Sequence, residues 1–245
     1  MEIFFEIHKD LPREGPGNNE STKKAFEFLK QLPFNSRILD IGCGPGMQTI
    51  QLAKITDCKI IALDTHQPFL DGLNQRAKSE GVQDGIETVN NSMFSLDFED
   101  DFFDLIWSEG AIYIFGFEKG LKEWRRFLKK GGYFVISELS WLKQNQPEEV
   151  KGFWNKYCPS IKLIEDNIQI IKNLGYDFLH NFTIPESGWW DDYYIPLENR
   201  ITLLRKKYKG NIEANKVLDQ ELEEIFLYKK YSEYYGYVFY IIQNK

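Results

Sequence analysis

The chain has few cysteines and no long apolar run. Its 245 residues include three cysteines, Cys43, Cys58 and Cys158, and their spacing fits neither a disulfide framework nor a zinc site. We therefore expect reduced thiols, no bound metal and a cytoplasmic location. No apolar run approaches membrane-spanning length, and residues 1–6 lack the basic leader of a signal peptide. These features predict a protein that does not act in a membrane.

Basic charge is also scarce. Lys and Arg number 30 against 37 Asp and Glu, which gives a formal net charge of −7. This balance argues against a broad basic surface for nucleic acid, and residues 205–207 are expected to form a solvated helix face. With no internal repeat or low-complexity linker, the chain is predicted to be one α/β domain whose partner is a small molecule.

The most informative feature present is a glycine-rich turn. Residues 38–41 include the apolar run of a buried parallel strand, and Gly42, Gly44 and Gly46 follow at alternate positions. Glycine permits a positive φ and leaves room for a ligand against the backbone. A helical pattern over residues 48–54 comes next, so the segment predicts a strand, a glycine turn and a helix N-terminus that bind a nucleotide-like ligand.

The spacing of this turn separates two ligand classes. Nicotinamide and flavin enzymes place a third small residue where this chain has Met47. The order Asp40-x-Gly42-x-Gly44-x-Gly46 instead resembles motif I of the class I S-adenosylmethionine (AdoMet)-dependent methyltransferases. An acidic residue beside the turn suits the ammonium of the amino-acid tail of AdoMet.

The ends of the next two predicted strands carry matching features. Asp64 ends an apolar strand over residues 59–63, where a carboxylate can accept from both ribose hydroxyls; the alternative is a helix N-cap. Thr65 is expected to border the adenine. The resemblance implies an acidic adenine contact at the end of the third strand, and this chain has Ser92 there. We expect Ser92 and the amide of Met93 to contact adenine instead.

A fourth match covers residues 101–138. A buried strand over residues 102–107 precedes Ser108 and Glu109, helical spacing runs over residues 118–130, and Lys-Lys-Gly-Gly closes that helix before a strand at residues 133–137. This order resembles the same family, and the specific motifs cover about residues 35–140.

The resemblance implies a fold and a division of the chain. We expect an α/β, Rossmann-like, seven-stranded and mostly parallel sheet, with helices on both faces and a last antiparallel strand at residues 237–243 beside the fifth. A helical insertion precedes that strand. Within a single domain, 1–245, the predicted parts are an N-terminal arm and helix (1–34), an AdoMet-binding core (35–140), the rest of the sheet (141–186 and 236–245) and a helical, aromatic substrate cap (187–235).

The predicted cofactor is AdoMet, with S-adenosylhomocysteine as its product. The residues expected to bind it are Asp40, Gly42, Cys43, Gly44, Gly46, Asp64, Thr65, Ser92, Met93, Ser108 and Glu109.

Catalytic and substrate-binding candidates follow from the same layout. Glu109 is the first candidate base because it follows the fourth strand, and Tyr113 lies one helical turn further. The alternative for Glu109 is a partner to a backbone amide or to Arg13, and Arg13 itself is a candidate substrate contact. Aromatic residues late in the chain either pack a core or line a pocket for a cationic or planar substrate; they include Trp189, Trp190, Tyr194 and Tyr235.

Three functions remain open from the sequence. The first is methyl transfer from AdoMet to a small molecule, with a small amine or an aromatic metabolite favoured. The second is a non-catalytic AdoMet-binding sensor, since methyl transfer needs no fixed catalytic side chain. The third is a nicotinamide-dependent oxidoreductase, against which Met47 and the Leu-Lys-Lys-Gly-Gly segment weigh.

Overall fold

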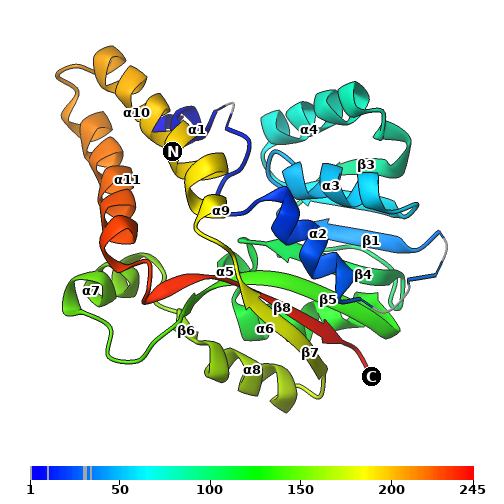
Figure 1. Cartoon of the computed structure of the whole chain (residues 1–245). Coiled ribbons are helices and arrows are strands. Elements are labelled where there is room, and N and C mark those ends of the chain that lie inside the picture. The colour runs from blue at the N-terminus through cyan, green and yellow to red at the C-terminus, as the bar shows by residue number, and fades with distance from the viewer. Residues whose placement is uncertain (1, 10, 30–31, 34) are drawn as a thin grey trace.

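The computed structural model describes residues 2–9, 11–29, 32–33 and 35–245. Its centre is an eight-stranded sheet in which the order is β3-β2-β1-β4-β5-β8-β7, with β6 paired to β5 (Figure 1). The strands are β1 (Arg37–Ile41), β2 (Lys59–Asp64), β3 (Ile86–Asn90), β4 (Phe103–Glu109), β5 (Leu128–Trp141), β6 (Lys162–Leu163), β7 (Asp177–Thr183) and β8 (Tyr235–Gln243).

The pairing directions place every ligand-binding loop at one edge of the sheet. Strands β1 to β5 pair in parallel, whereas β8 runs antiparallel to both β5 and β7. This confirms the expected Rossmann-like sheet with its last strand antiparallel beside the fifth, and it adds the two-residue β6 to the seven predicted strands. The chain order reverses between β1 and β4, and open α/β sheets bind ligands at such a switch point.

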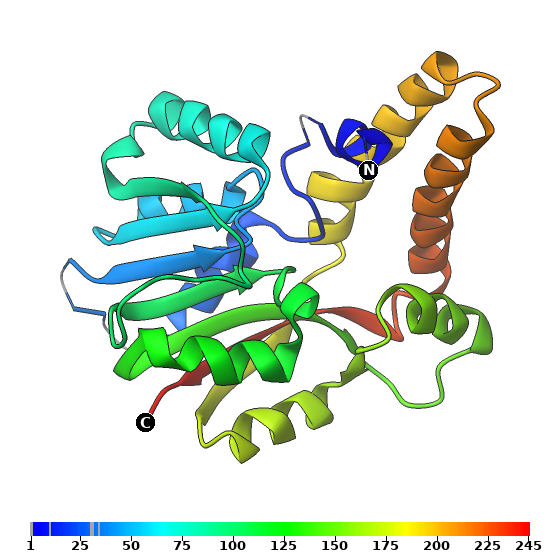
Figure 2. The same ribbon diagram turned by 180° about the vertical axis from the view of Figure 1, so that it is seen from behind.

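Helices cover both faces of the sheet (Figures 1 and 2). On one face lie α2 (Asn19–Glu27), α3 (Met47–Ile55) and α4 (Gln67–Glu80), and on the other lie α6 (Phe117–Glu123) and α8 (Ile164–Asn173). Alternation along β1 explains this division: Ile38 belongs to the core beneath α2 and α3, whereas Leu39 and Ile41 pack into the core beneath α6 and α8. The 3₁₀ turn Gln83–Gly85 leads into β3.

One predicted helix is shorter in the structure. The helix expected over 118–130 ends at Glu123, continues as a 3₁₀ turn (Trp124–Phe127) and gives way to β5 at Leu128. The glycine stop predicted for this helix lies inside the strand, because the Gly131 amide donates to the Asn244 carbonyl at 2.8 Å. The helix expected within the N-terminal part, 1–34, is α2, which is capped by Asn18 and ends at Glu27.

A second core lies above the carboxyl edge of the sheet. It joins α1 (Glu2–His8), α7 (Glu148–Tyr157), α9 (Ser187–Trp189), a π-helical turn (Trp190–Tyr194), α10 (Ile195–Lys207) and α11 (Ile212–Tyr231). The α10–α11 hairpin projects beyond the sheet, and α1 packs beside it, so the first and the last fifth of the chain meet there (Figures 1 and 2). Helix α1 was not predicted from the sequence. No helix in the described part of the chain has the length and apolar content needed to span a membrane.

Candidate functional site

A cavity of about 310 Å³ opens at the carboxyl ends of β1, β2, β3 and β4. Its walls come from the glycine turn, the loops after the three other strands, the short helix α5 (Ile112–Phe115) and the N-terminal arm. It is called the strand-end cleft here. The lining residues are Phe5, Arg13, Glu14, Gly15, Pro16, Gly42, Cys43, Gly44, Pro45, Gln48, Leu63, Asp64, Thr65, His66, Phe69, Asn91, Ser92, Met93, Phe94, Glu109, Gly110, Ala111, Tyr113 and Ile114.

The amides of the glycine turn are already used inside the protein. Those of Gly42 and Cys43 donate to the Leu63 carbonyl at 2.8 and 3.0 Å, and that of Gly46 donates to the Cys43 carbonyl at 3.0 Å. The Gly44 amide donates to Asp64 at 3.0 Å, and Pro45 has no amide hydrogen. A turn that binds pyrophosphate offers its amides to the ligand, so this geometry disfavours a dinucleotide.

Asp64 holds the place predicted for it. Its carboxylate ends β2, faces the strand-end cleft, and also accepts from the His66 amide at 2.9 Å. Each carboxylate oxygen keeps a further lone pair for a ligand hydroxyl. Ser92, Met93, Cys43 and Thr65 also line the cleft.

Three of the expected AdoMet contacts, Asp40, Gly46 and Ser108, are not among the residues that line the cleft. Asp40 is fully buried and accepts from the Thr49 hydroxyl at 2.6 Å, so it fixes the start of α3. Burial raises the pKa of the Asp40 carboxyl to about 7. The Ser108 hydroxyl donates to the Ile41 carbonyl at 2.9 Å. Gly46 faces Leu73, where it allows α3 to pack against α4.

Glu109 is fully engaged by other parts of the protein. One of its oxygens accepts from Arg13 at 3.1 Å, and the other accepts from Thr22 at 2.7 Å and from the Trp107 indole at 2.9 Å. Both Arg13 and Glu109 are about 6 % exposed at the side chain. The second sequence alternative, a partner to Arg13, is therefore what the structure shows, and both oxygens of this carboxylate already accept hydrogen bonds from the protein.

The N-terminal arm is held across the cleft by further contacts. Arg13 also donates to Asn19 at 3.0 Å, and the Gly17 amide donates to the Gly188 carbonyl at 2.9 Å. The ring of Phe5 stacks on His66 with centroids 4.0 Å apart. Arg13 thus meets a carboxylate of the protein, whereas the sequence suggested one of the ligand or substrate.

A second cavity of about 190 Å³ adjoins the first and is called the cap cavity here. The two share Glu14, Gly15, Pro16 and Tyr113. Tyr113 is 40 % exposed because it borders both cavities, and desolvation raises the pKa of its phenol to about 12, so it stays protonated at neutral pH. The other residues of the cap cavity are His8, Leu139, Phe153, Trp154, Tyr157, Cys158, Tyr193, Gln220, Glu221, Glu224 and Tyr237.

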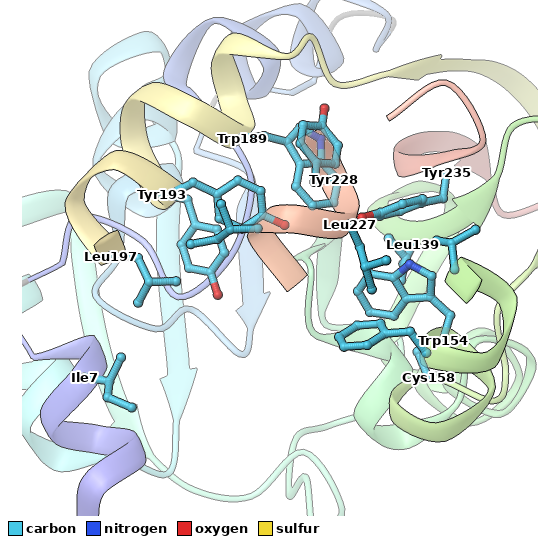
Figure 3. Close-up of a cluster of buried hydrophobic side chains, with 14 of the residues drawn as sticks. Ile7, Leu139, Trp154, Cys158, Trp189, Tyr193, Leu197, Leu227, Tyr228 and Tyr235 are labelled. Carbon is cyan, nitrogen blue, oxygen red and sulfur yellow. The ribbon is translucent and has the colours of Figure 1, made fainter. Parts of the chain in front are cut away.

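Most of the predicted aromatic substrate contacts are core residues. Trp189, Tyr194 and Tyr235 are at most 1 % exposed and line neither cavity. Figure 3 shows Trp189 and Tyr235 with Tyr228 in the second core, where Trp189 stacks on Tyr228 at 4.0 Å. Trp190 packs against the same core and lies under the Lys229 ammonium at 5.1 Å. Of the two roles considered from the sequence, the structure therefore shows core packing, since these rings pack between the helices of the second core.

Several cavity residues were missed from the sequence. Glu14, Glu221 and Glu224 lie in segments with no recognisable motif, and they converge only because the arm and α11 pack against each other. Among the described residues, no cluster of three or more His, Cys, Asp or Glu has the geometry of a metal site.

The buried carboxyl of Glu138 is expected to make folding stability depend on pH. Glu138 on β5 is 2 % exposed, one of its oxygens has no partner among the described residues, and burial raises its pKa to about 8. Between its ordinary value of 4.5 and about 8 the folded state binds the extra proton, so this group makes stability fall as pH rises. The free energy of unfolding, measured by urea titration at several pH values, should therefore have a negative slope against pH. We expect Glu138→Gln to reduce that slope by up to about 1.4 kcal/mol per pH unit. An unchanged slope would contradict the assignment.

Comparison with known proteins agrees with this architecture. Residues 39–136 match the family model described as a methyltransferase domain. The sterol 24-C-methyltransferase of Clavispora lusitaniae is 26% identical over 198 residues, which cover 75% of this chain and 52% of that protein. The sarcosine/dimethylglycine N-methyltransferase of Halorhodospira halochloris is 32% identical over 122 residues, or 49% of this chain and 44% of that protein. The chain spans about half the length of the curated relatives it matches.

A solved structure resembles the whole chain. It is a SAM-dependent methyltransferase from Geobacter sulfurreducens in complex with S-adenosyl-L-homocysteine, with a TM-score of 0.85 and 21% identity. The match covers 100% of this chain and 98% of that one, and it shows that the two share a fold.

A glycine turn at the switch point of a parallel sheet, with a carboxylate ending the next strand, defines a nucleoside-binding α/β protein. The matched domain narrows this class. Residues 39–136 match a methyltransferase domain, and the whole chain shares the fold of a SAM-dependent methyltransferase structure.

Proposed function

We propose that this protein binds AdoMet in the strand-end cleft and transfers its methyl group to a small molecule held in the cap cavity. The observation that carries the proposal is the continuity of the two cavities through Glu14 and Tyr113. A methyl donor in one cavity and an acceptor in the other would meet at this junction. AdoMet supplies a methyl group already activated by a sulfonium, so the protein mainly aligns the reactants and excludes water.

The cleft residues fit this ligand by charge and by hydrogen bonding. AdoMet carries a sulfonium and an ammonium, and the cleft carries Glu14, Asp64 and Glu109. Its one arginine, Arg13, is neutralised by Glu109. In the proposal Asp64 accepts from the ribose hydroxyls, Ser92 and Met93 border the adenine with Thr65, and Gly42, Cys43 and Gly44 lie against the amino-acid tail. Glu109 and Arg13 position the arm that covers the ligand.

A small amine or an aromatic metabolite is the proposed acceptor. Support comes from the six aromatic rings that line the cap cavity and from its carboxyl groups, because ring faces and carboxylates both stabilise positive charge. The relative named sarcosine/dimethylglycine N-methyltransferase supports the amine alternative.

The proposed function is tested in two stages. Calorimetry with AdoMet, S-adenosylhomocysteine and NAD is expected to show binding of the first two and not of the third. Transfer of tritiated methyl groups from AdoMet into a metabolite extract is then expected to label small molecules. Binding without any labelling would favour an AdoMet sensor, and binding of NAD alone would overturn the proposal in favour of an oxidoreductase.

Asp64→Ala tests the ligand assignment. We expect it to weaken S-adenosylhomocysteine binding by about 1–3 kcal/mol, because it removes a charged acceptor for the ribose and releases the Gly44 amide. Calorimetry measures the change. The matched control is Asp84→Ala, an exposed carboxylate outside the cleft, which is expected to leave the affinity unaltered. Equal affinities for the wild type and Asp64→Ala would place the ribose elsewhere.

A further inference from the structure

The cap cavity has the chemical character of a cation site. Six of its residues carry aromatic rings, and its described lining includes three glutamates and no lysine or arginine. The rings are those of Tyr113, Phe153, Trp154, Tyr157, Tyr193 and Tyr237. Desolvated aromatic faces and carboxylates are the two protein groups that stabilise an ammonium, and they are combined here in about 190 Å³.

The glutamates on α11 face this cavity without a positive partner. Glu221 is 8 % exposed, and it has no hydrogen-bond donor or opposite charge among the described residues. Glu224, one helical turn on, accepts from the Tyr194 hydroxyl at 2.9 Å and from no other group among the described residues. A buried carboxylate without a cation is costly for the folded protein. The pair is therefore better explained as half of an ion pair whose other half is a ligand.

Glu14 stands where the two cavities meet. It lines both of them, and its Cγ atom lies 3.3 Å from the position that a Cβ on Gly44 would occupy. Its Oε1 atom is buried and has no hydrogen-bond partner among the described residues. This carboxyl oxygen can therefore accept a hydrogen bond or a proton from a substrate that extends out of the cap cavity toward the methyl donor.

We propose that the cap cavity binds the ammonium form of an aliphatic amine between Glu221 and Glu224, and that Glu14 accepts the proton which this amine must lose before methylation. The inference rests on the proposed function, and it names the acceptor class and the base. It also gives Glu14 the role that the sequence assigned to Glu109, because Glu109 is occupied by Arg13, Thr22 and Trp107.

The chemistry balances with these groups. The ammonium transfers one proton to Glu14, and the freed nitrogen lone pair forms the new bond to the methyl carbon. The carbon–sulfur bond of the donor breaks, and its electron pair stays on sulfur. The products are a methylated ammonium, the neutral thioether and a protonated Glu14, which returns its proton to solvent. A fully methylated cation retains the charge that the cavity recognises.

The titration of the cavity carboxyls supports this assignment. Burial raises the pKa of Glu14 and of Glu221 to about 8 and that of Glu224 to about 7, and the charges of Asp64 and Glu221 raise that of Glu14 further. A bound cation favours the ionised carboxylates, so cation binding releases protons and strengthens as pH rises. The other titratable groups that face these carboxyls are His8, Asp64, Tyr113, Glu138, Tyr157, Cys158, Tyr193, Tyr194, Tyr235 and Tyr237.

The first experiment measures binding without turnover. The full chain, saturated with S-adenosylhomocysteine, is titrated calorimetrically with choline and with neohexyl alcohol, in which carbon replaces the charged nitrogen. Short primary, secondary and tertiary amines complete the panel. We expect at least one cation to bind about tenfold or more tightly than its neutral isostere, with affinity rising between about pH 6 and pH 9. Buffers of different ionisation enthalpy should reveal proton release.

Variants on α11 assign that binding to the cap cavity. Glu221→Gln is expected to lower the affinity for the cation by about 30-fold and to leave the affinity for the neutral isostere unchanged. Glu223→Gln, an exposed glutamate of the same helix, is the matched control and is expected to change neither. If S-adenosylhomocysteine binds but no cation of the panel does at about 10 mM, or if cation and isostere bind equally, the inference is overturned while the proposed function stands. If the wild-type protein does not bind S-adenosylhomocysteine at all, the proposed function itself is contradicted.

Glu14→Gln tests the base. Methyl transfer from tritiated AdoMet to the amine that binds best is expected to fall about 100-fold or more in kcat, and its pH dependence is expected to flatten. Calorimetry on the same variant should show a much smaller change in S-adenosylhomocysteine affinity than in kcat, because Asp64 and the ribose and adenine contacts remain. Wild-type kcat, or a loss confined to S-adenosylhomocysteine affinity, would show that Glu14 serves the methyl donor and would overturn its assignment as the base.

Discussion

Replacement of Gly42 by alanine is expected to destabilise the fold by about 2–5 kcal/mol and to abolish measurable AdoMet binding. Gly42 has a φ of +72°, which L-residues adopt only with strain. An added Cβ would also lie 2.5 Å from the Cβ of Ala111, a distance that real Cβ atoms do not tolerate. Because Ala111 is a short side chain on the loop between β4 and α5, the backbone of the turn or of that loop must move.

Neither segment can move without further losses. The Gly42 amide and the next one both donate to Leu63, so a shift of the turn breaks the link between the ends of β1 and β2. A shift of Ala111 displaces α5, which carries Tyr113 at the junction of the two cavities. The strand-end cleft would therefore change shape from both sides.

Gly81→Ala is the control for the backbone strain alone. Gly81 has a φ of +71° at the end of α4, and nothing lies within 4 Å of its added Cβ. We expect it to cost about 1–2 kcal/mol in urea denaturation and to leave ligand affinity intact. If both alanine variants lost the same stability, the contact with Ala111 would not be the constraint, and the expected failure of ligand binding would lose its basis.

The parts predicted well from the sequence are those in which a local pattern determines the structure. The apolar run of β1, the glycines of the turn and Asp64 at the end of β2 are each visible in a few consecutive residues. Their assembly follows from parallel pairing, which brings the ends of successive strands to one edge of the sheet. For the same reason the cleft walls formed by Cys43, Thr65, Ser92 and Met93 agree with the sequence prediction.

The expectations that differ from the structure concern contacts that no short sequence pattern reveals. Asp40 looked like a ligand contact because it precedes the turn, but strand alternation points it beneath α3, to Thr49. The helix expected to reach residue 130 stops early because Gly131 pairs with Asn244 at the far end of the chain. Trp189 and Tyr235 pack against each other in the second core. A short stretch of sequence does not show whether an aromatic ring will lie in a core or line a pocket.

In the proposed mechanism Glu14 takes the role of base that the sequence suggested for Glu109, and the position of the arm explains the difference. Glu109 follows a motif strand, whereas Glu14 lies in a proline- and glycine-rich segment that sequence reasoning treats as a loop. The arm crosses the cleft because Arg13 has a buried partner 96 residues away. That ion pair engages Glu109 and places Glu14, which follows Arg13 in the sequence, at the junction of the cavities. The site therefore depends on a salt bridge that contacts no substrate.

Glu109→Ala is consequently expected to cost about 3–5 kcal/mol of folding stability, because it leaves the Arg13 guanidinium buried without its counter-ion. It also removes the acceptor of Thr22 and of the Trp107 indole. We expect residues 13–17 to leave the cleft, which would expose them to proteolysis and lower affinity for both ligands. Urea denaturation and limited proteolysis measure the two effects.

The matched control is Glu80→Ala, which breaks the exposed ion pair between Lys54 and Glu80. Because both of its side chains are about two-fifths exposed, its loss is expected to cost less than about 1 kcal/mol. Adding Arg13→Ala to Glu109→Ala should restore about 1–3 kcal/mol, since no buried charge then lacks a partner. The opposite result would be a Glu109→Ala variant that is as stable as Glu80→Ala, keeps residues 13–17 protected from proteolysis and loses only turnover. That result would support Glu109 as the base in place of Glu14.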